Sequence, residues 1–167
     1  MDYLIFSDSH RHPEKIREVL SRQISRPRGV FFLGDGVADA KDAVGGIPLY
    51  AVSGNCDGFL SPGDTSPQER LVTVEGVRVL LLHGHLYGVK SGPGAAIAHA
   101  AREGADVLLF GHTHEPFYET IDKGETVGGV TLPRPLYVLN PGSIGYGNSF
   151  AVLTVRDGVP HLSHGSL

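Results

Sequence analysis

Five short apolar runs each end in a polar cluster whose side chains could bind a metal ion or transfer a proton. In chain order the clusters read SDSH, LGD, SGNCD, HGH and GHTH. Together they gather two aspartates, one asparagine and four or five histidines. Imidazole with carboxylate suits manganese, iron, zinc, cobalt or nickel, whereas a site for magnesium or calcium alone would use oxygen ligands. Because one ion that also binds water needs fewer ligands, two ions that share a bridging carboxylate fit the count better.

The elements that must position these clusters are strands that alternate with helices. In the first third of the chain, apolar strands end at Asp8, Asp35 and Asn55, and predicted helices cover 13–24 and 38–45. Such an order indicates a parallel sheet covered on both faces. Ligands of open α/β sheets bind outside the carboxyl ends of the strands, so the clusters should converge there.

The second half of the chain contains a predicted hairpin, an alanine-rich helix over 94–103, a further buried strand and then antiparallel strands. Turns are expected at Glu75-Gly76, Lys123-Gly124 and Asp157-Gly158. Residues two apart in an extended segment point the same way. That rule predicts three pairs of site residues: Asp8 with His10, His83 with His85, and His112 with His114.

The length, the cysteine count and the net charge restrict the location and the partners of the protein. A length of 167 residues fits one domain over 1–167. The single cysteine, Cys56, rules out an internal disulfide framework, and neither a membrane-spanning run nor a signal peptide is evident, so we expect a cytoplasmic protein without membrane contacts. A net charge of −4 argues against binding of long nucleic acid but does not exclude a phosphate substrate, since a local metal charge can outweigh the global balance.

The motifs DSH, GD, GNCD, HGH and GHTH, in this order and each at a predicted strand end, resemble those of the calcineurin-like metallophosphoesterases, in particular their small, single-domain prokaryotic branch. The resemblance runs from Asp8 to the NPGS sequence at 140–143. It implies an α/β fold, a four-layer α/β/β/α sandwich of two central mixed β-sheets flanked by helices. It also implies two divalent ions, with manganese favoured and iron, zinc, nickel or cobalt as alternatives.

The resemblance assigns the ligands motif by motif. Asp35 resembles the bridging carboxylate. The first ion would be bound by Asp8, His10 and His114, and the second by Asn55, His83 and His112. His85 would either reach the substrate phosphate or support a ligand, and both roles stay open.

Four further residues near the site are assigned supporting or altered roles. Cys56 stands where many relatives carry a histidine that protonates the leaving group, and a thiol is the poorer acid near pH 7. Asp57 is expected to orient a neighbouring group, and Asp39 to act as a helix N-cap rather than to face the site. Asn140 and Ser143 are expected to support ligand histidines.

The resulting functional prediction is a metal-dependent phosphoesterase, in particular a phosphodiesterase, that hydrolyses a small phosphoester by in-line attack of a metal-bridging hydroxide. Whether the ester is nucleotide-like is left open. A preference for good leaving groups follows from Cys56. The alternative is a non-catalytic interaction scaffold on the same fold, as in a eukaryotic retromer subunit that resembles this family. A scaffold is free to lose ligands, and this chain has lost none. A homo-oligomer is left open.

Overall fold

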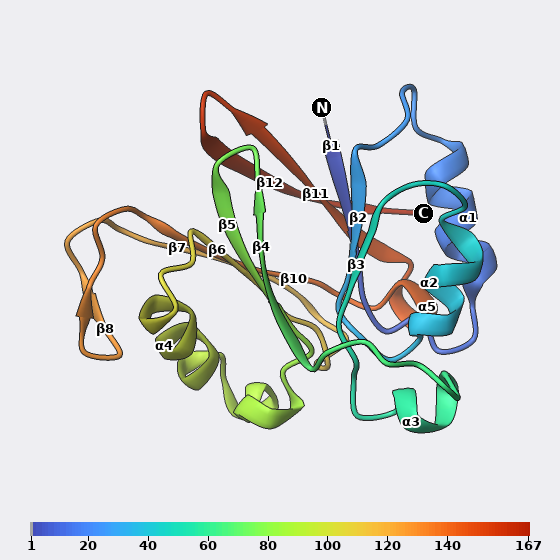
Figure 1. The fold of residues 1–167 in the computed structure, drawn as a ribbon, viewed down its shortest axis with the longest axis horizontal. Coiled ribbons are helices and arrows are strands. Elements are labelled where there is room, and N and C mark those ends of the chain that lie inside the picture. The colour runs from blue at the N-terminus through green and yellow to red at the C-terminus, as the bar shows by residue number, and fades with distance from the viewer. Residues whose placement is uncertain (1) are drawn as a thin grey trace.

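Two five-stranded mixed sheets pack face to face and carry helices on their outer faces (Figure 1). The structure is a computed structural model that describes residues 2–167. The first sheet has the order β12-β11-β1-β2-β3. Its strands are β12 (Val159–Ser166), β11 (Ser149–Arg156), β1 (Asp2–Phe6), β2 (Gly29–Phe32) and β3 (Leu49–Ala51).

The second sheet has the order β4-β5-β6-β10-β7, and a separate two-stranded hairpin lies beside α4. The strands of the second sheet are β4 (Glu69–Val74), β5 (Val77–Leu82), β6 (Val107–Leu109), β10 (Leu136–Pro141) and β7 (Pro116–Ile121), and the hairpin joins β8 (Thr126–Val127) to β9 (Val130–Thr131). The helices are α1 (Pro13–Ser21), α2 (Val37–Ala43), α3 (Asp57–Leu60), α4 (Gly94–Arg102) and α5 (Ile144–Gly147), with 3₁₀ turns η1 (His85–Tyr87) and η2 (Val89–Ser91).

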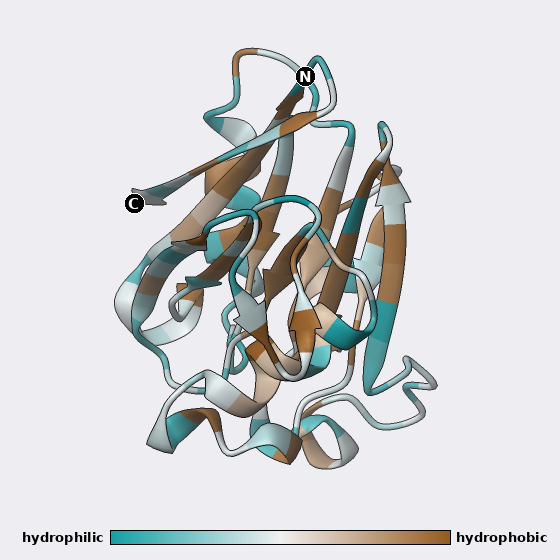
Figure 2. Cartoon of the chain, turned by 90° about the vertical axis from the view of Figure 1, so that its left-hand side faces the viewer, coloured by the Kyte–Doolittle hydropathy of each residue, from teal (hydrophilic) through white to brown (hydrophobic). Residues whose placement is uncertain are grey.

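Alternation along the strands builds three separate apolar layers, which explains the four-layer sandwich. In β1, Ile5 points between the two sheets, whereas Leu4 and Phe6 pack against the outer helices. In β5, Leu81 faces the same inner layer and Leu80 faces α4. β1 and β5 are therefore apolar on both faces, and much of the hydrophobic colour in Figure 2 lies on strands.

The fold class predicted from the resemblance is confirmed, but the expectation drawn from the first apolar runs needs correction. The parallel strands β1, β2 and β3 have helices on one face only. The second sheet covers their other face. Apolar alternation alone could not distinguish a covering sheet from a covering helix, because both bury the same side chains.

One polar cluster ties the segment 85–91 to the second sheet and to α4. The hydroxyl of Tyr87 donates to Glu69 (2.7 Å), and the Nε2 atom of His99 lies 2.7 Å from the other oxygen of that carboxylate. Burial alone would raise the pKa of Glu69, but these two partners lower it below its ordinary value. Among the described residues, no helix is long and apolar enough to cross a membrane.

Candidate metal centre

The polar clusters converge where the carboxyl ends of parallel strands from both sheets meet. Asp8 and Asp35 follow β1 and β2 of the first sheet, and His83 and His112 follow β5 and β6 of the second. The amide of His112 donates to the Oδ2 atom of Asp8 (3.1 Å), so a hydrogen bond joins the two sheets at the centre. Parallel pairing within each sheet brings these strand ends to one edge, as the sequence predicted.

The first group of ligand atoms consists of Asp8, His10 and His114. The Oδ1 atom of Asp8 lies 3.2 Å from Nε2 of His114 and 3.6 Å from Nε2 of His10, and these two Nε2 atoms are 3.3 Å apart. The other oxygen of Asp8 accepts hydrogen bonds from the Ser7 hydroxyl and the His112 amide. Oδ1 is buried and accepts no hydrogen bond from the described residues, so it is the oxygen that points at the two imidazoles.

The second group consists of Asp35, His83 and His112. Nε2 of His83 lies 3.1 Å from Nδ1 of His112 and 3.3 Å from Oδ2 of Asp35. Nδ1 of His83 lies 2.6 Å from the carbonyl oxygen of Leu33, which can only accept, so the proton of this imidazole sits on Nδ1. When the ring is neutral, Nε2 therefore carries a lone pair that points into the centre, an orientation common among metal-binding histidines.

Asp35 connects the two groups. Its Oδ2 atom lies 3.3 Å from Nε2 of His83 and 3.8 Å from Nε2 of His10. Its Oδ1 atom instead accepts the backbone N–H of Cys56 (2.8 Å). One oxygen is held by the loop after β3 and the other faces both groups, which is the placement that a bridging carboxylate requires.

Asp57 holds the loop that carries Asp35. Its buried carboxylate accepts hydrogen bonds from the amides of Asp35 (2.7 Å), Gly36 (2.8 Å) and Gly54 (2.7 Å). It also accepts from the amide of Val37 and the hydroxyl of Ser61. Asp57 thus lies under the backbone of the centre and holds the loop amides, and its orienting role stays a prediction.

The site residues share an unusual backbone conformation. Asp8, His10, Asp35, His112 and His114 all have φ between 44° and 70°, and they account for five of the nine non-glycine residues with positive φ in the described part of the chain. L-residues adopt this region only at a cost of about 1 kcal/mol or more each. The loops are therefore strained where the ligand atoms converge.

This conformation explains why the pairing rule for residues two apart is wrong for GHTH. His112 and His114 belong to different groups, because the segment turns at both residues instead of running extended. Asp8 and His10 do share a group, as predicted, although they too have positive φ, so an extended backbone is not the reason. The rings of His83 and His85 lie 5.4 Å apart, but His85 belongs to neither group.

The electric field of the centre shifts several pKa values in opposite directions. Burial alone would raise the pKa of Asp8, but His10, His114, His83 and Ser7 outweigh it and lower that pKa well below its ordinary range. Burial alone would lower the pKa of His83, yet the two carboxylates raise it.

The pKa values of His112 and Cys56 are shifted by a different balance of burial and charge. Burial, together with the positive charge of His83 and of Lys90, lowers the pKa of His112 to about 4. His112 is therefore a neutral imidazole near neutral pH. Burial and the nearby Asp35 raise the pKa of the Cys56 thiol, so Cys56 stays protonated there and is no thiolate nucleophile.

Other predicted residues lie at the edge of the centre. Asn55 is exposed, and its amide nitrogen lies 3.5 Å from the sulfur of Cys56. His85 lines the same polar cavity as Asn55, and its Nδ1 atom is buried without a hydrogen-bond partner among the described residues.

The N-cap of α2 is Gly36, so the capping role predicted for Asp39 is wrong. Asp39 instead accepts hydrogen bonds from the hydroxyl of Ser9 (2.6 Å) and the amide of Arg11 (2.8 Å).

The supporting roles expected of the NPGS segment hold for the backbone but not for the histidine rings. Asn140 donates to the carbonyl of Gly111 (3.0 Å) and to the hydroxyl of Thr113 (2.9 Å), and Ser143 donates to the carbonyl of Asp8 (2.8 Å). These bonds fix the loops that bear the ligands.

Sequence reasoning missed two contributors. The hydroxyl of Ser7 orients the carboxylate of Asp8, and its place beside an aspartate was the available signal. Tyr146 stacks on His10 with ring centroids 4.8 Å apart and an interplanar angle of 23°. Nothing in the sequence indicated this contact, because it depends on how α5 folds back over the loop after β1.

The donor set fits divalent transition-metal ions. Two pairs of imidazole nitrogens face each other at 3.3 Å and 3.1 Å, and each pair lies beside a carboxylate oxygen. A buried carboxylate oxygen without a hydrogen bond is costly unless a cation satisfies it. Six of the seven predicted ligands lie in the two groups, and Asn55 lies on the neighbouring loop.

Solved structures show the same fold. A structure described as a novel archaeal phosphodiesterase matches with a TM-score of 0.72 at 22% identity and covers 100% of each chain. Vps29 from Chaetomium thermophilum matches with a TM-score of 0.70 at 19% identity, covering 100% of this chain and 95% of that one.

Sequence relatives establish the family. YsnB of Bacillus subtilis, a probable metallophosphoesterase, is 31% identical over 163 residues, which are 94% of this chain and 86% of that protein. Phosphodiesterase YfcE of Escherichia coli is 36% identical over 95 residues, 52% of this chain and 46% of YfcE. Residues 1–158 match the model of the calcineurin-like phosphoesterase superfamily domain. With its two converging ligand groups at the strand ends, this chain belongs to the calcineurin-like phosphoesterase superfamily.

Proposed function

We propose that this chain is a metal-dependent phosphodiesterase whose centre holds two divalent transition-metal ions. The observation that carries the proposal is the position of Asp35, whose Oδ2 atom lies within 3.8 Å of a histidine from each ligand group. Asp8, His10 and His114 would hold one ion. His83, His112 and Asn55 would hold the other, and Asp35 would contact both. Manganese is the expected metal.

Two bound ions would supply Lewis acidity at the phosphoryl oxygens and an acidified water as nucleophile. The chain's own residues would then orient the metal ligands and select the leaving group. Asp57 and the Cys56 amide fix Asp35, Leu33 fixes His83, and the Cys56 thiol stays protonated beside the substrate. Because a protonated thiol of raised pKa gives up its proton poorly, esters with good leaving groups are the expected substrates.

The substrate is expected to be a small phosphoester, nucleotide-like in size. The relative named YfcE is a phosphodiesterase, and it supports the diester assignment over the half of the chain that it matches. A single domain over residues 1–167 stays a prediction.

The test joins metal content with turnover. Purified protein loaded with manganese should contain about two ions per chain and hydrolyse bis-p-nitrophenyl phosphate. Asp35→Asn should lower both readouts, because an amide cannot bridge two cations as a carboxylate does. Asp42→Asn is the control, since its carboxylate is exposed and pairs with Arg17 on the surface. Fully loaded protein that cleaves none of a panel of mono- and diesters would overturn the proposal.

The second candidate is an interaction scaffold. Two observations favour it: the fold of Vps29, and three exposed apolar side chains on segments that border the centre, namely Phe59, Leu86 and Tyr146. Metal analysis separates the two candidates. A scaffold has no need of a filled centre, whereas the complete ligand set predicts that both groups are filled.

A further inference from the structure

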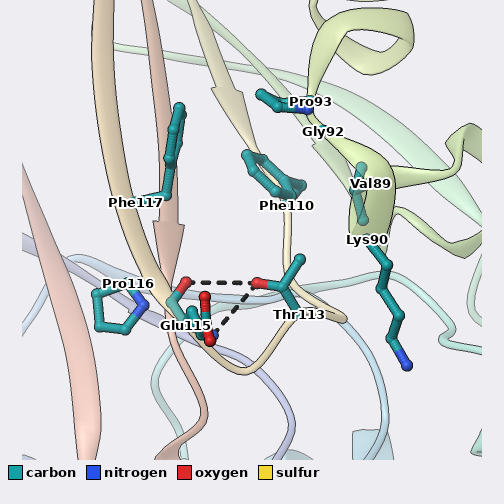
Figure 3. A pocket seen from close by; sticks show the side chains of 9 residues that line it. All are labelled: Val89, Lys90, Gly92, Pro93, Phe110, Thr113, Glu115, Pro116 and Phe117. Carbon is teal, nitrogen blue, oxygen red and sulfur yellow. Dashed lines mark hydrogen bonds between the residues drawn. The ribbon is translucent and has the colours of Figure 1, made fainter.

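Two cavities with different linings border the candidate centre, one with aromatic side chains and one without. The first has a volume of about 440 Å³. Its walls include the rings of Phe110 and Phe117, with Val89 and Lys90 to one side and Thr113 below them in Figure 3. The two rings lie 6.0 Å apart at an interplanar angle of 56°. Lys90, Thr113 and Glu115 are the polar side chains of this lining, and the others are hydrocarbon or glycine.

The second cavity has a volume of about 490 Å³ and polar walls. Ser53, Asn55, Asp64, Gln68 and His85 line it, together with glycines that expose backbone groups. The Ser53 hydroxyl donates to Asp64 (3.0 Å), and the buried Nδ1 atom of His85 has no hydrogen-bond partner among the described residues. Amide, hydroxyl and carboxylate groups of this kind both donate to and accept from ligand hydroxyls.

Both cavities lie next to the ligand groups and share no lining residue. Thr113 separates His112 from His114, and its hydroxyl is fixed by Asn140 (2.9 Å) and the amide of Glu115 (3.2 Å). Lys90 is close enough that its charge lowers the pKa of His112. The loop after β3 lines the second cavity, and the Cys56 amide of the same loop donates to Asp35.

The geometry points to a mixed phosphodiester as the substrate, with a planar aromatic arm in the Phe110–Phe117 cavity and a hydroxyl-bearing arm in the Ser53–Gln68 cavity. This inference rests on the proposed function. A phosphomonoester has one organic arm and would leave one cavity without a role. Cavities of roughly 300–1,000 Å³ with a few placed polar groups are typical of small-molecule sites. Aromatic walls favour a flat ring, and Lys90 at the rim adds attraction for the phosphoryl charge.

The experiment compares diesters that share one p-nitrophenyl arm. The second arm is methyl, n-propyl, 2,3-dihydroxypropyl or another p-nitrophenyl group. We expect kcat/KM for the dihydroxypropyl diester to exceed that for the propyl diester about tenfold, the effect of one or two hydrogen bonds. A second p-nitrophenyl arm should give no such gain, because it would have to enter the polar cavity.

Two variants locate the arms. Gln68→Leu, at an exposed position, should lower kcat/KM for the dihydroxypropyl diester towards that for the propyl diester, a larger fall than for the methyl diester. Phe117→Leu should raise KM for all p-nitrophenyl diesters. Tyr118→Phe is its matched control, since Tyr118 is exposed and does not line the cavity.

A binding readout separates failure of this inference from failure of the proposed function. Metal-depleted protein is titrated with the dihydroxypropyl p-nitrophenyl diester while amide NMR shifts are followed. Shifts at Val89 and Thr113 together with shifts at Ser53 and Gln68 support the two-arm site, even if no diester is hydrolysed. Equal kcat/KM for all four diesters, or shifts confined to one cavity, would overturn the inference and leave a phosphodiesterase without arm selection.

Discussion

Replacement of Asp57 by asparagine tests whether one buried carboxylate supports the centre from beneath. In the wild-type structure, one oxygen accepts the amides of Asp35 and Gly54, and the other accepts the amides of Gly36 and Val37 and the Ser61 hydroxyl. Asparagine keeps only one acceptor oxygen. In either orientation at least two of the five hydrogen bonds are lost, and their donors face an NH₂ group instead.

The magnitude follows from that count. Hydrogen bonds to a charged acceptor contribute about 1.5–3 kcal/mol each, so the loss of two should lower the free energy of unfolding by roughly 3–6 kcal/mol. Because natural domains are stable by only about 5–15 kcal/mol, the loss should be conspicuous. The same change frees the loop that carries Asp35 and, through Gly54, the loop that carries Asn55. Since Asn55 would hold only the second ion, that ion should be lost before the first.

Urea unfolding of metal-free protein measures the stability, and metal analysis after dialysis measures the occupancy. Asp42→Asn serves as control, with an expected change within about 0.5 kcal/mol because its partner Arg17 is also exposed. If Asp57→Asn costs less than about 1 kcal/mol and still binds two ions, the hydrogen bonds to Asp57 do not hold the centre together, and the reasoning is refuted.

Three further changes probe other parts of the site. Gly54→Ala would place a methyl group 2.2 Å from the Oδ1 atom of Asp35, so metal analysis should show reduced occupancy, whereas Gly58→Ala, with no atom within 4 Å, should bind metal normally. Cys56→His should raise turnover of diesters with poor leaving groups, as measured by steady-state kinetics; unchanged rates would make the thiol a bystander. Because the pKa of Glu69 is lowered in the folded state, its contribution to stability is present above about pH 4.3 and is lost as the pH falls through the folded pKa; Glu69→Gln should therefore flatten the acid limb of a plot of unfolding free energy against pH.

Residue types and strand ends were sufficient to predict which side chains meet. Asp8, Asp35, His83 and His112 each follow an apolar run, and parallel pairing brings such ends together regardless of loop detail. The two-sheet architecture came from the family resemblance, because alternation along β1 records that both faces are buried but not what covers them.

Loop geometry could not be predicted in the same way. The separation of His112 from His114 depends on positive φ values, which histidine adopts more often than most residues but which its type alone does not fix at a given position. The hydrogen bond from the Cys56 amide to Asp35 is a backbone contact, so the side chain at position 56 carries no signal of it. The stacking of Tyr146 on His10 likewise depends on tertiary packing of α5.

The left-handed backbone at the five site residues has a consequence for sequence drift. A glycine at Asp8, His10, Asp35, His112 or His114 would relieve the backbone strain, by about 1 kcal/mol at each position. In a chain that no longer uses its centre, relief of that strain would stabilise the folded form. The loss of the contacts made by the original side chain would destabilise it, so the two effects partly cancel. In a protein that served only to bind partner proteins, substitution of these five residues by glycine would therefore cost little folding stability. In this chain all five positions carry aspartate or histidine instead of glycine, as the proposed ion-binding role requires.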